Sequence, residues 1–274
     1  FAKEMTNCPM CLITFAYDSH PVYSLILIAN RDEFFRRPSR EVHYWQDTPH
    51  ILAGRDLEQG GTWLGLNKHG HFATVTNHRN GREKPQGVRS RGDLTRRYLQ
   101  EQQPASRYLR NLEPEQHTYG AFNLLLGDET GMHYLSNRSD AAQRALAPGV
   151  YGLSNALLDT PWPKLLNVRN GLTQQLRDHC LTPDTLISLM MDQTQAADTD
   201  LPDTGISAEW EKMLSSCFIR STDYGTRAIT LLLQKPDGTT YLREDTFDTR
   251  GNTDSQEFQL QLPAIGAAAR INQE

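Results

Sequence analysis

Two apolar segments near the start of the chain are separated by a short run of turn residues, which is the pattern of a β-hairpin. Residues 11–17 and 23–29 are rich in β-branched and aromatic side chains and have strand length. Residues 18–21 between them read Asp-Ser-His-Pro, which is a turn composition. We therefore predict an antiparallel pair of strands at the N-terminal end.

The same pattern of two apolar runs around a polar turn recurs along the chain. The turn at 235–238 reads Lys-Pro-Asp-Gly, a strong reversal signal. Further predicted pairs are 63–66 with 71–76, 119–126 with 132–136, and 228–234 with 240–243, and shorter strands are predicted at 151–154 and 258–262.

Helical periodicity is concentrated between these strand pairs. The longest example, 162–181, follows Thr160-Pro161 and places Leu165, Val168, Leu172 and Leu176 on one stripe. Other predicted helices are 93–102, 183–191 and 208–214. Strand pairs at both ends with helices between them favour an α+β fold of antiparallel sheets covered by helices, rather than an alternating βαβ chain. The pattern contains neither a repeat nor a linker, so we expect one domain.

Composition and charge narrow the function classes. Of the 274 residues 38% are apolar, and the 19 glycines add about 7%, which together match the composition of a globular chain. The net charge of −5 makes non-specific nucleic-acid binding a poor prediction. No run of 18 apolar residues is present, so we predict no membrane span. The first ten residues lack the apolar core of a secretory signal, and we expect a cytoplasmic protein.

Four cysteines are too few for a disulfide scaffold, but one of them has an unusual position. Cys8 and Cys11 form a CxxC without a second pair, and Cys180 and Cys217 stand alone, so no metal site is predicted. Cys11 follows Met10 and opens an apolar strand. Removal of Met10 would give Cys11 a free α-amino group that could take the thiol proton, whereas the simpler interpretation is a buried structural cysteine.

Polar residues at predicted strand ends are candidates for the groups around such a nucleophile. Asn30-Arg31-Asp32-Glu33 directly follows residues 23–29 and would project side chains to both faces of the sheet. A guanidinium near Cys11 would favour the thiolate, and a carboxylate would orient the amine. Asn77 and Asn155 also follow predicted strands and could donate to an oxyanion. A solvated loop and turn-forming asparagines are the alternatives.

Basic residues gather in one stretch of this acidic chain. Residues 79–97 hold seven basic side chains against two acidic ones, which suits a carboxylate, phosphate or propionate, or equally a solvated surface. Arg227 precedes the strand at 228–234 and is either a buried structural cation or part of a site. The basic side chains of the stretch are Arg79, Arg82, Lys84, Arg89, Arg91, Arg96 and Arg97.

The order and spacing of these motifs, rather than any one of them, resemble a known family. The chain is similar to the NRDE family, also called the transport and Golgi organization protein family. The resemblance covers about residues 10–242. It is carried by Met10-Cys11-Leu12-Ile13, Ala29-Asn30-Arg31-Asp32-Glu33, Gly60-Gly61-Thr62-Trp63-Leu64-Gly65, Val75-Thr76-Asn77 with Arg79, Ser90-Arg91-Gly92, Tyr151-Gly152-Leu153-Ser154-Asn155 and Tyr224-Gly225-Thr226-Arg227.

The family resembles N-terminal-nucleophile hydrolases, so the resemblance implies a four-layer αββα sandwich of antiparallel sheets. It implies that Cys11 is the nucleophile, that its freed amine is the base and that Arg31 assists the thiolate. It implies an amine-holding carboxylate, for which Asp32 and Glu33 are alternatives. The remaining implied catalytic residues are Asn77, Asn155 and Arg227, and the expected ligand-binding residues are Asn30, Glu33, Trp63, Arg79, Arg89 and Arg91.

Two functions follow from this resemblance. The first is cysteine-dependent hydrolysis of a linear amide of a small molecule, without a cofactor. The second is a non-enzymatic carrier of haem or another amphipathic anion, including acyl-coenzyme A or lipid-linked ligands, with His69, His71 and His78 as candidate haem ligands. The domain is expected over residues 11–274, with 1–10 as an extension that is either removed to expose Cys11 or foreign to the native chain.

Overall fold

The computed structural model describes residues 10–83, 87–139, 143–178 and 181–271, and these form two antiparallel sheets packed face to face. Within the described residues the first sheet has six strands in the order β10-β1-β2-β11-β12-β13. Its strands are β1 (Met10–Tyr17), β2 (Leu25–Phe34), β10 (Gly149–Leu153), β11 (Tyr224–Gln234), β12 (Thr239–Asp248) and β13 (Gly251–Gln261).

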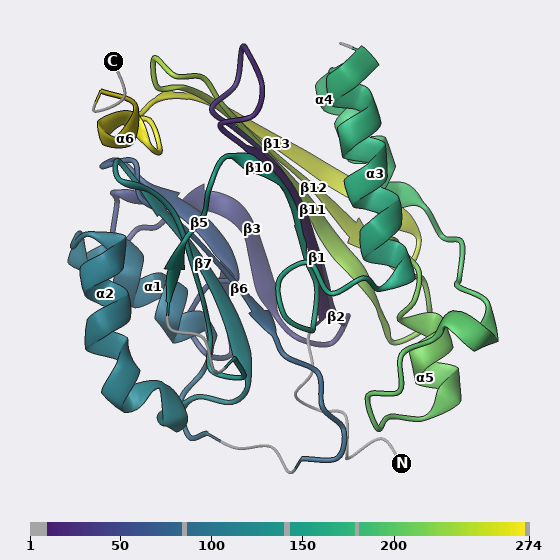
Figure 1. Ribbon diagram of the computed structural model, residues 1–274. Coiled ribbons are helices and arrows are strands. Elements are labelled where there is room, and N and C mark those ends of the chain that lie inside the picture. Colours follow the sequence, from purple (N-terminus) through teal and green to yellow (C-terminus); the bar gives the residue numbers. More distant parts are fainter. Residues whose placement is uncertain (1–9, 84–86, 140–142, 179–180, 272–274) are drawn as a thin grey trace.

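The second sheet has seven strands in the described part of the chain, in sequence order from β3 to β9 (Figure 1). Consecutive strands pair as neighbours, as expected for chain segments joined by short turns. Its strands are β3 (Ser39–Tyr44), β4 (Ile51–Asp56), β5 (Leu64–Asn67), β6 (Phe72–Asn77), β7 (Phe122–Asp128), β8 (Gly131–Ser136) and β9 (Arg144–Ala145).

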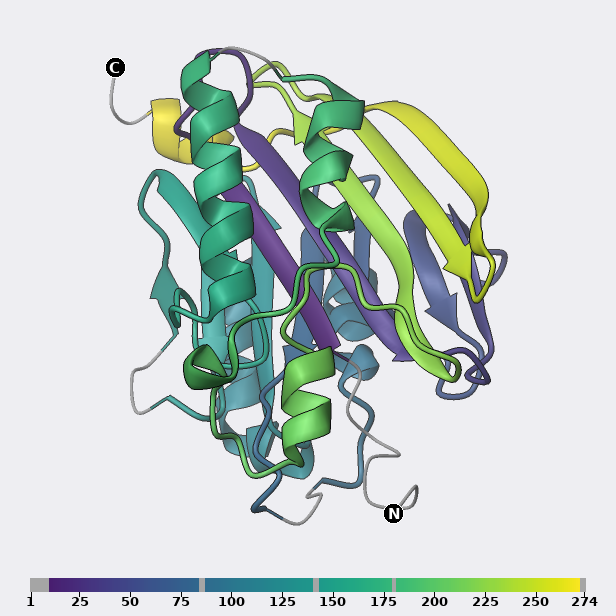
Figure 2. The ribbon, with the colours of Figure 1, turned by 90° about the vertical axis from the view of Figure 1, so that its right-hand side faces the viewer.

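Helices cover the outer face of each sheet. α3 (Pro163–Asp178) and α4 (Pro183–Ser188) lie over the first sheet, as Figure 2 shows, and α1 (Gly92–Glu101) and α2 (Ala105–Leu112) lie over the second. α5 (Ala208–Met213) packs near the start of β11, and α6 (Ala267–Ile271) follows the last strand. The predicted four-layer αββα arrangement of antiparallel sheets is therefore confirmed.

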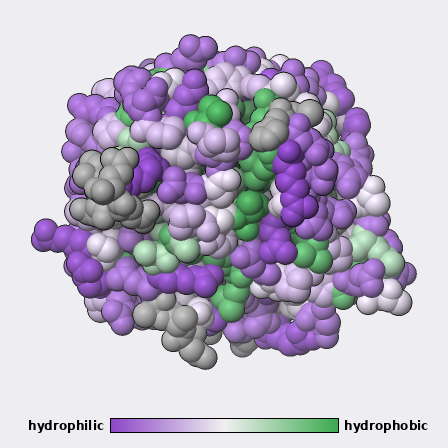
Figure 3. All heavy atoms as spheres, turned by 45° about the horizontal axis from the view of Figure 1, so that its top comes forward, coloured by the Kyte–Doolittle hydropathy of each residue, from purple (hydrophilic) through white to green (hydrophobic). Residues whose placement is uncertain are grey.

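Three apolar layers hold this sandwich together. Alternate residues of β1 divide between two of them: Ile13 and Phe15 enter the layer between the sheets, and Leu12 and Ala16 enter the layer under α3 and α4. Full burial of one such large side chain contributes roughly 1.5–3 kcal/mol. The face shown in Figure 3 is mostly hydrophilic, with hydrophobic residues in a narrow band down its middle.

The strand boundaries correct one prediction. β2 does not end at Ala29 but continues through the Asn-Arg-Asp-Glu tetrapeptide to Phe34, because β1 supplies ladder partners as far as Asp32 and β11 as far as Phe34. Cys11 lies opposite Arg31, and Asp32 lies opposite Met10 on one side and Thr226 on the other. A bulge at Arg227 shifts the register of β11 at this point.

Candidate active site

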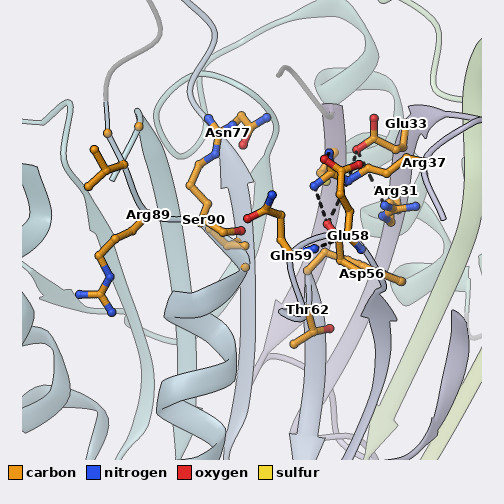
Figure 4. Close-up of a pocket in the computed structure, with 18 residues that line it drawn as sticks. Arg31, Glu33, Arg37, Asp56, Glu58, Gln59, Thr62, Asn77, Arg89 and Ser90 are labelled. Carbon is orange, nitrogen blue, oxygen red and sulfur yellow. Dashed lines mark hydrogen bonds and ion pairs between the residues drawn. The ribbon is translucent and has the colours of Figure 1, made fainter. Parts of the chain in front are cut away.

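A cavity of about 370 Å³ opens between the two sheets, at the end where β1 begins and β6 ends (Figure 4). Its lining includes Cys11, Trp63 and Asn77. In Figure 4, Asn77, Ser90 and Arg89 lie along one side of the cavity, opposite a cluster of acidic and basic side chains. That cluster consists of Arg31, Glu33, Arg37, Asp56 and Glu58.

Cys11 is the second residue of β1, and it lines the cavity. The residue is only 7% exposed, and it is opposite Arg31 in the ladder. Burial, and after it the charge of Asp32, raises the pKa of the thiol to about 12, while Arg31 opposes the shift. In a chain that continues before Cys11, the thiol is therefore protonated at neutral pH and is a poor nucleophile.

The tetrapeptide divides its four side chains between two faces of β2. Arg31 and Glu33 line the cavity, whereas Asn30 and Asp32 alternate with them and face α3 and α4. Asn30 donates from Nδ2 to the carbonyls of Cys217 (2.7 Å) and Met190 (3.3 Å). Asn30 therefore does not line the predicted binding cavity and instead ties β2 to the segments that cover it.

Arg31 is held on the cavity wall from three directions. Its guanidinium carbon lies 4.2 Å from the centre of the Trp63 ring, and its Nη2 lies 3.8 Å from Glu33 Oε2. Nη1 is 3.5 Å from the hydroxyl of Ser39. Glu33 also lies 3.6 Å from Arg37 Nε. The wall beside Cys11 is thus a network of ion pairs in which Glu33 lies between Arg31 and Arg37.

Asp32 is the other candidate carboxylate, and its side chain lies on the face of the sheet opposite the cavity. Its Oδ1 accepts a 2.7 Å hydrogen bond from the hydroxyl of Thr226. Within the described ranges, its buried Oδ2 has no hydrogen-bond partner. Burial raises the pKa of this carboxyl to about 6, against the opposing effects of Lys164 and Thr226. An unsatisfied buried oxygen next to the backbone of β1 is suited to accept from a nearby N–H donor.

The two predicted oxyanion residues have different positions. Asn77 lines the cavity, but Asn155 is fully buried behind it and is absent from the lining. Asn155 Nδ2 donates to the carbonyl of Asn77 (3.0 Å), and the neighbouring Ser154 hydroxyl donates to the carbonyl of Cys11 (3.2 Å). The loop after β10 therefore fixes the backbone of both cavity residues.

Two predicted arginines also lie off the cavity wall. Arg79 is buried in an ion pair with Glu211 (2.9 Å) and stacks on Trp162, 4.4 Å from the ring centre. Arg227 donates from Nη1 to the carbonyls of Phe34 (3.3 Å) and Arg37 (2.6 Å). Both side chains hold loops at the ends of strands. Neither lines the cavity.

The basic stretch is largely neutralised by its surroundings. Arg89 lines the cavity but pairs with Asp93 (2.6 Å) and Glu115 (2.9 Å). Arg91 also lines the cavity and donates to the carbonyl of Ala121 (3.3 Å). Further ion pairs in the stretch are Arg82–Asp203, Arg96–Asp93 and Arg97–Glu115. Lys84, like Cys8 and Cys180, lies outside the described residues.

The histidines proposed as haem ligands are not in the cavity lining. His71 stacks on Tyr98 with 5.1 Å between ring centres, and His69 faces His50. No group of three metal-ligating side chains occurs among the residues the structure describes. No helix in the described part of the chain is long and apolar enough to cross a membrane.

Sequence reasoning missed one buried cation close to this site. Lys164, in the first turn of α3, is 3% exposed and interacts electrostatically with Asp32. A signal was available, because Lys164, Val168 and Leu172 are spaced four residues apart and share a helix face. Lysine in the first turn of a helix is usually exposed, so its place on this apolar face was not recognised.

Comparisons with solved structures find only distant likenesses. The conjugated bile acid hydrolase from Clostridium perfringens, in a mutant form, aligns over 91% of this chain and 92% of its own, with 8% identity and a TM-score of 0.43. The Caenorhabditis elegans N-acylethanolamine-hydrolyzing acid amidase ortholog aligns over 66% of this chain and 85% of its own, with 12% identity and a TM-score of 0.33.

Sequence comparisons give much stronger matches. The Transport and Golgi organization protein 2 homologs of Bos taurus and Homo sapiens are each 36% identical over 92% of this chain and all of their own length. The Drosophila melanogaster Transport and Golgi organization protein 2 is 27% identical over 86% of this chain and 92% of its own. The family model described as Transport and Golgi organisation 2 matches residues 10–249. The chain therefore belongs to the Transport and Golgi organisation 2 family, for which NRDE is an alternative name.

Proposed function

We propose that the protein is a cysteine hydrolase that cleaves a linear amide bond of a small molecule after Cys11 becomes the first residue. The observation that carries this proposal is the position of Cys11 at the start of β1, with its thiol in a cavity wall beside Arg31. The cavity, about 370 Å³, is the size of a small-molecule site.

Release of the residues before Cys11 supplies the base that the buried thiol lacks. The freed α-amine has an ordinary pKa near 8 and lies within one residue of the thiol. It takes the Sγ proton, and Sγ then attacks the amide carbon to give an acyl-enzyme. The ammonium returns the proton to the leaving nitrogen, and water hydrolyses the thioester to regenerate the thiol.

The neighbouring groups have roles that their positions suit. Arg31 stabilises the thiolate from the opposite strand, and Asn77 is the cavity amide available to the developing oxyanion. Asp32 is favoured over Glu33 as partner of the amine, because Glu33 is engaged with Arg31 and Arg37. We assign Asn155, Arg79 and Arg227 supporting roles, since each holds backbone or loops behind the cavity.

The test begins with the N-terminus in the native host. Intact-mass analysis is expected to give a chain that starts at Cys11, and a uniformly unprocessed chain would contradict the proposal. The processed protein is then incubated with a panel of N-acyl aminocoumarins, which release a fluorescent amine. Turnover and a mass increase equal to the acyl group are expected, and both disappear in Cys11→Ala.

A carrier of an amphipathic anion is the second candidate. It is favoured by the cavity rim, where Val88, which is 95% exposed, directly precedes the cavity residues Arg89 and Arg91. Haem, acyl-coenzyme A and lipid-linked anions share this combination of apolar body and acidic group. Haem titration is expected to change the visible absorption, and the change is expected to weaken in the R89A/R91A double variant. No spectral change at micromolar haem would exclude haem as the ligand.

A further inference from the structure

Lys164 is a buried cation that forms no ion pair with any residue the structure describes. It enters the layer between α3 and the first sheet, and its Nζ has no hydrogen-bond partner in the described part of the chain. An uncompensated buried ammonium is costly, so its retention calls for an explanation other than stability. Burial lowers the pKa of Lys164, and the charge of Asp32 opposes this effect most strongly.

The groups around Lys164 come from four parts of the chain. The titratable and charged groups that act on it are Asp32 of β2, Arg79 after β6, Cys217 before β11 and Cys11 of β1. The carbonyl of Lys164 accepts a 3.6 Å contact from Cys217 Sγ, and the carbonyl of Cys217 accepts from Asn30. Lys164 is thus packed behind the strand pair whose opposite face bears the Cys11 thiol.

Two unsatisfied acceptors face the same layer. Besides Lys164 Nζ, the buried atoms Asp32 Oδ2 and Asn30 Oδ1 have no hydrogen-bond partner within the residues described. Asn30 and Asp32 are alternate residues of β2 and lie on one face of it. A site with two free acceptors and a nearby cation suits a neutral amine, which can donate N–H bonds without adding a second positive charge.

The backbone register shows where such an amine would arise. Met10 is the ladder partner of Asp32, and Cys11 is the next residue of β1. Cleavage after Met10 removes that partner and leaves the new amine of Cys11 next to Asp32. This step rests on the proposed function, which needs the amine to be uncharged before it can accept the thiol proton.

We propose that Lys164 is a positioning residue for this base: its ammonium keeps Asp32 ionised, and it disfavours a second positive charge on the Cys11 amine. The attraction to Asp32 orients the carboxylate toward the amine, and the repulsion between like charges keeps the amine neutral. The proton from Sγ then moves to the amine, and the thiolate formed in the same step balances the charge. The charged groups that act on the Cys11 thiol are Asp32, Arg31, Glu33 and Lys164.

The test measures Cys11 alkylation rather than turnover, so it needs no substrate. A fusion is cleaved in vitro to leave Cys11 first, and the rate of iodoacetamide labelling is followed between pH 5 and 10. Lys164→Met is expected to raise the pH of half-maximal labelling by about one unit, which is about a tenfold lower rate on the rising limb. Lys164→Arg, which keeps the charge, is expected to stay within about threefold of the parent.

Two controls separate this effect from a structural one. The exposed Lys68→Met is expected to leave the profile unchanged. Lys164→Met in the chain that keeps residues before Cys11 is expected to shift the profile less, because that chain has no α-amine at Cys11. Equal shifts in both forms, or no shift in either, would overturn the proposal.

A variant that fails to fold does not end the test. The D32N/K164M double variant removes both buried charges, and it is compared with Asp32→Asn alone. A higher pH of half-maximal labelling in the double variant supports the proposal, and coincident profiles contradict it. An unprocessed N-terminus in the native host would remove the proposed hydrolase function, whereas the Lys164 effect in the protein cleaved in vitro would stand, so the two failures are distinguishable.

Discussion

The guanidinium of Arg31 lies over the ring of Trp63, with its central carbon 4.2 Å from the centre of the ring. Arg31 comes from the first sheet and Trp63 from the segment before β5 of the second, so the contact crosses the sandwich beside Cys11. Trp63 therefore holds Arg31 in place, and Arg31 is the ladder partner of the candidate nucleophile Cys11. The glycine-tryptophan motif and the tetrapeptide, separate in sequence, meet in this stack.

Loss of the Trp63 ring is expected to destabilise this cation. Trp63→Leu removes the stacking surface and part of the cover over Arg31, and we expect the free energy of unfolding to fall by about 2–3 kcal/mol. Urea denaturation measures the change. Trp63→Phe keeps an aromatic face and is expected to lose about 1 kcal/mol less, so equal losses in the two variants would refute the stacking role.

Gly54 in β4 makes room for the same indole. A β-carbon at this position would stand well inside contact distance of the Trp63 ring, so Gly54→Ala forces the ring to move. We expect a loss of about 1–3 kcal/mol and a shift in tryptophan emission, because overpacking displaces the indole. Gly149→Ala is the matched control, since its new β-carbon would meet Tyr151 at an ordinary 3.4 Å. An unshifted emission spectrum in Gly54→Ala would refute this packing constraint.

The sequence allowed the strand pairs to be predicted where apolar runs flank a clear turn. The pairing of residues 11–17 with 23–29 is observed as β1 with β2, and the helix predicted at 162–181 is observed as α3. Strands with an irregular pattern were missed wholly or in part. β3, which has one buried residue, Val42, was not predicted, and the strand predicted at 258–262 covers only the end of β13, which is mostly exposed at the edge of the sheet.

The motifs of the site could be predicted from the sequence, but the face of the sheet on which each side chain lies could not. The strand was expected to end before Asn30, and only the two neighbouring strands reveal that the tetrapeptide is paired and that its residues alternate between faces. Lys164 was missed for a related reason. Its burial depends on the packing of α3 against β1, a contact between distant parts of the chain that the local pattern of the helix does not specify.

Asn155 is expected to support the site through the backbone rather than through the cavity. Asn155→Ala leaves the carbonyl of Asn77 without its 3.0 Å donor, inside the protein. A buried group that loses its partner costs about 1–3 kcal/mol, and we expect urea denaturation to give a loss of about 2 kcal/mol. Asn80→Ala, whose side-chain bonds are exposed, is expected to lose under about 1 kcal/mol. Similar losses in both variants would refute the supporting role.

Glu244 makes the stability of the fold depend on pH. This carboxyl is buried between the sheets, where Oε1 accepts from the N–H of Val42 (2.7 Å) and Oε2 from the hydroxyl of Thr230 (3.1 Å). Burial raises the pKa of Glu244 from 4.5 to about 7, against the opposing effects of these donors and of Arg31. The folded protein therefore retains a proton here between about pH 4.5 and 7 that the unfolded chain has released.

That retained proton makes the folded state lose stability as the pH rises through this window. A shift of this size corresponds to roughly 3 kcal/mol between the two ends of the window. Glu244→Gln keeps a carbonyl for Val42 and a group that can bond to Thr230, but it does not ionise. Its stability relative to the parent is expected to improve by about 3 kcal/mol between pH 4 and pH 8, as measured by urea denaturation. Glu113→Gln, at an exposed position, is expected to follow the parent, and parallel curves for Glu244→Gln and the parent would refute the buried titration.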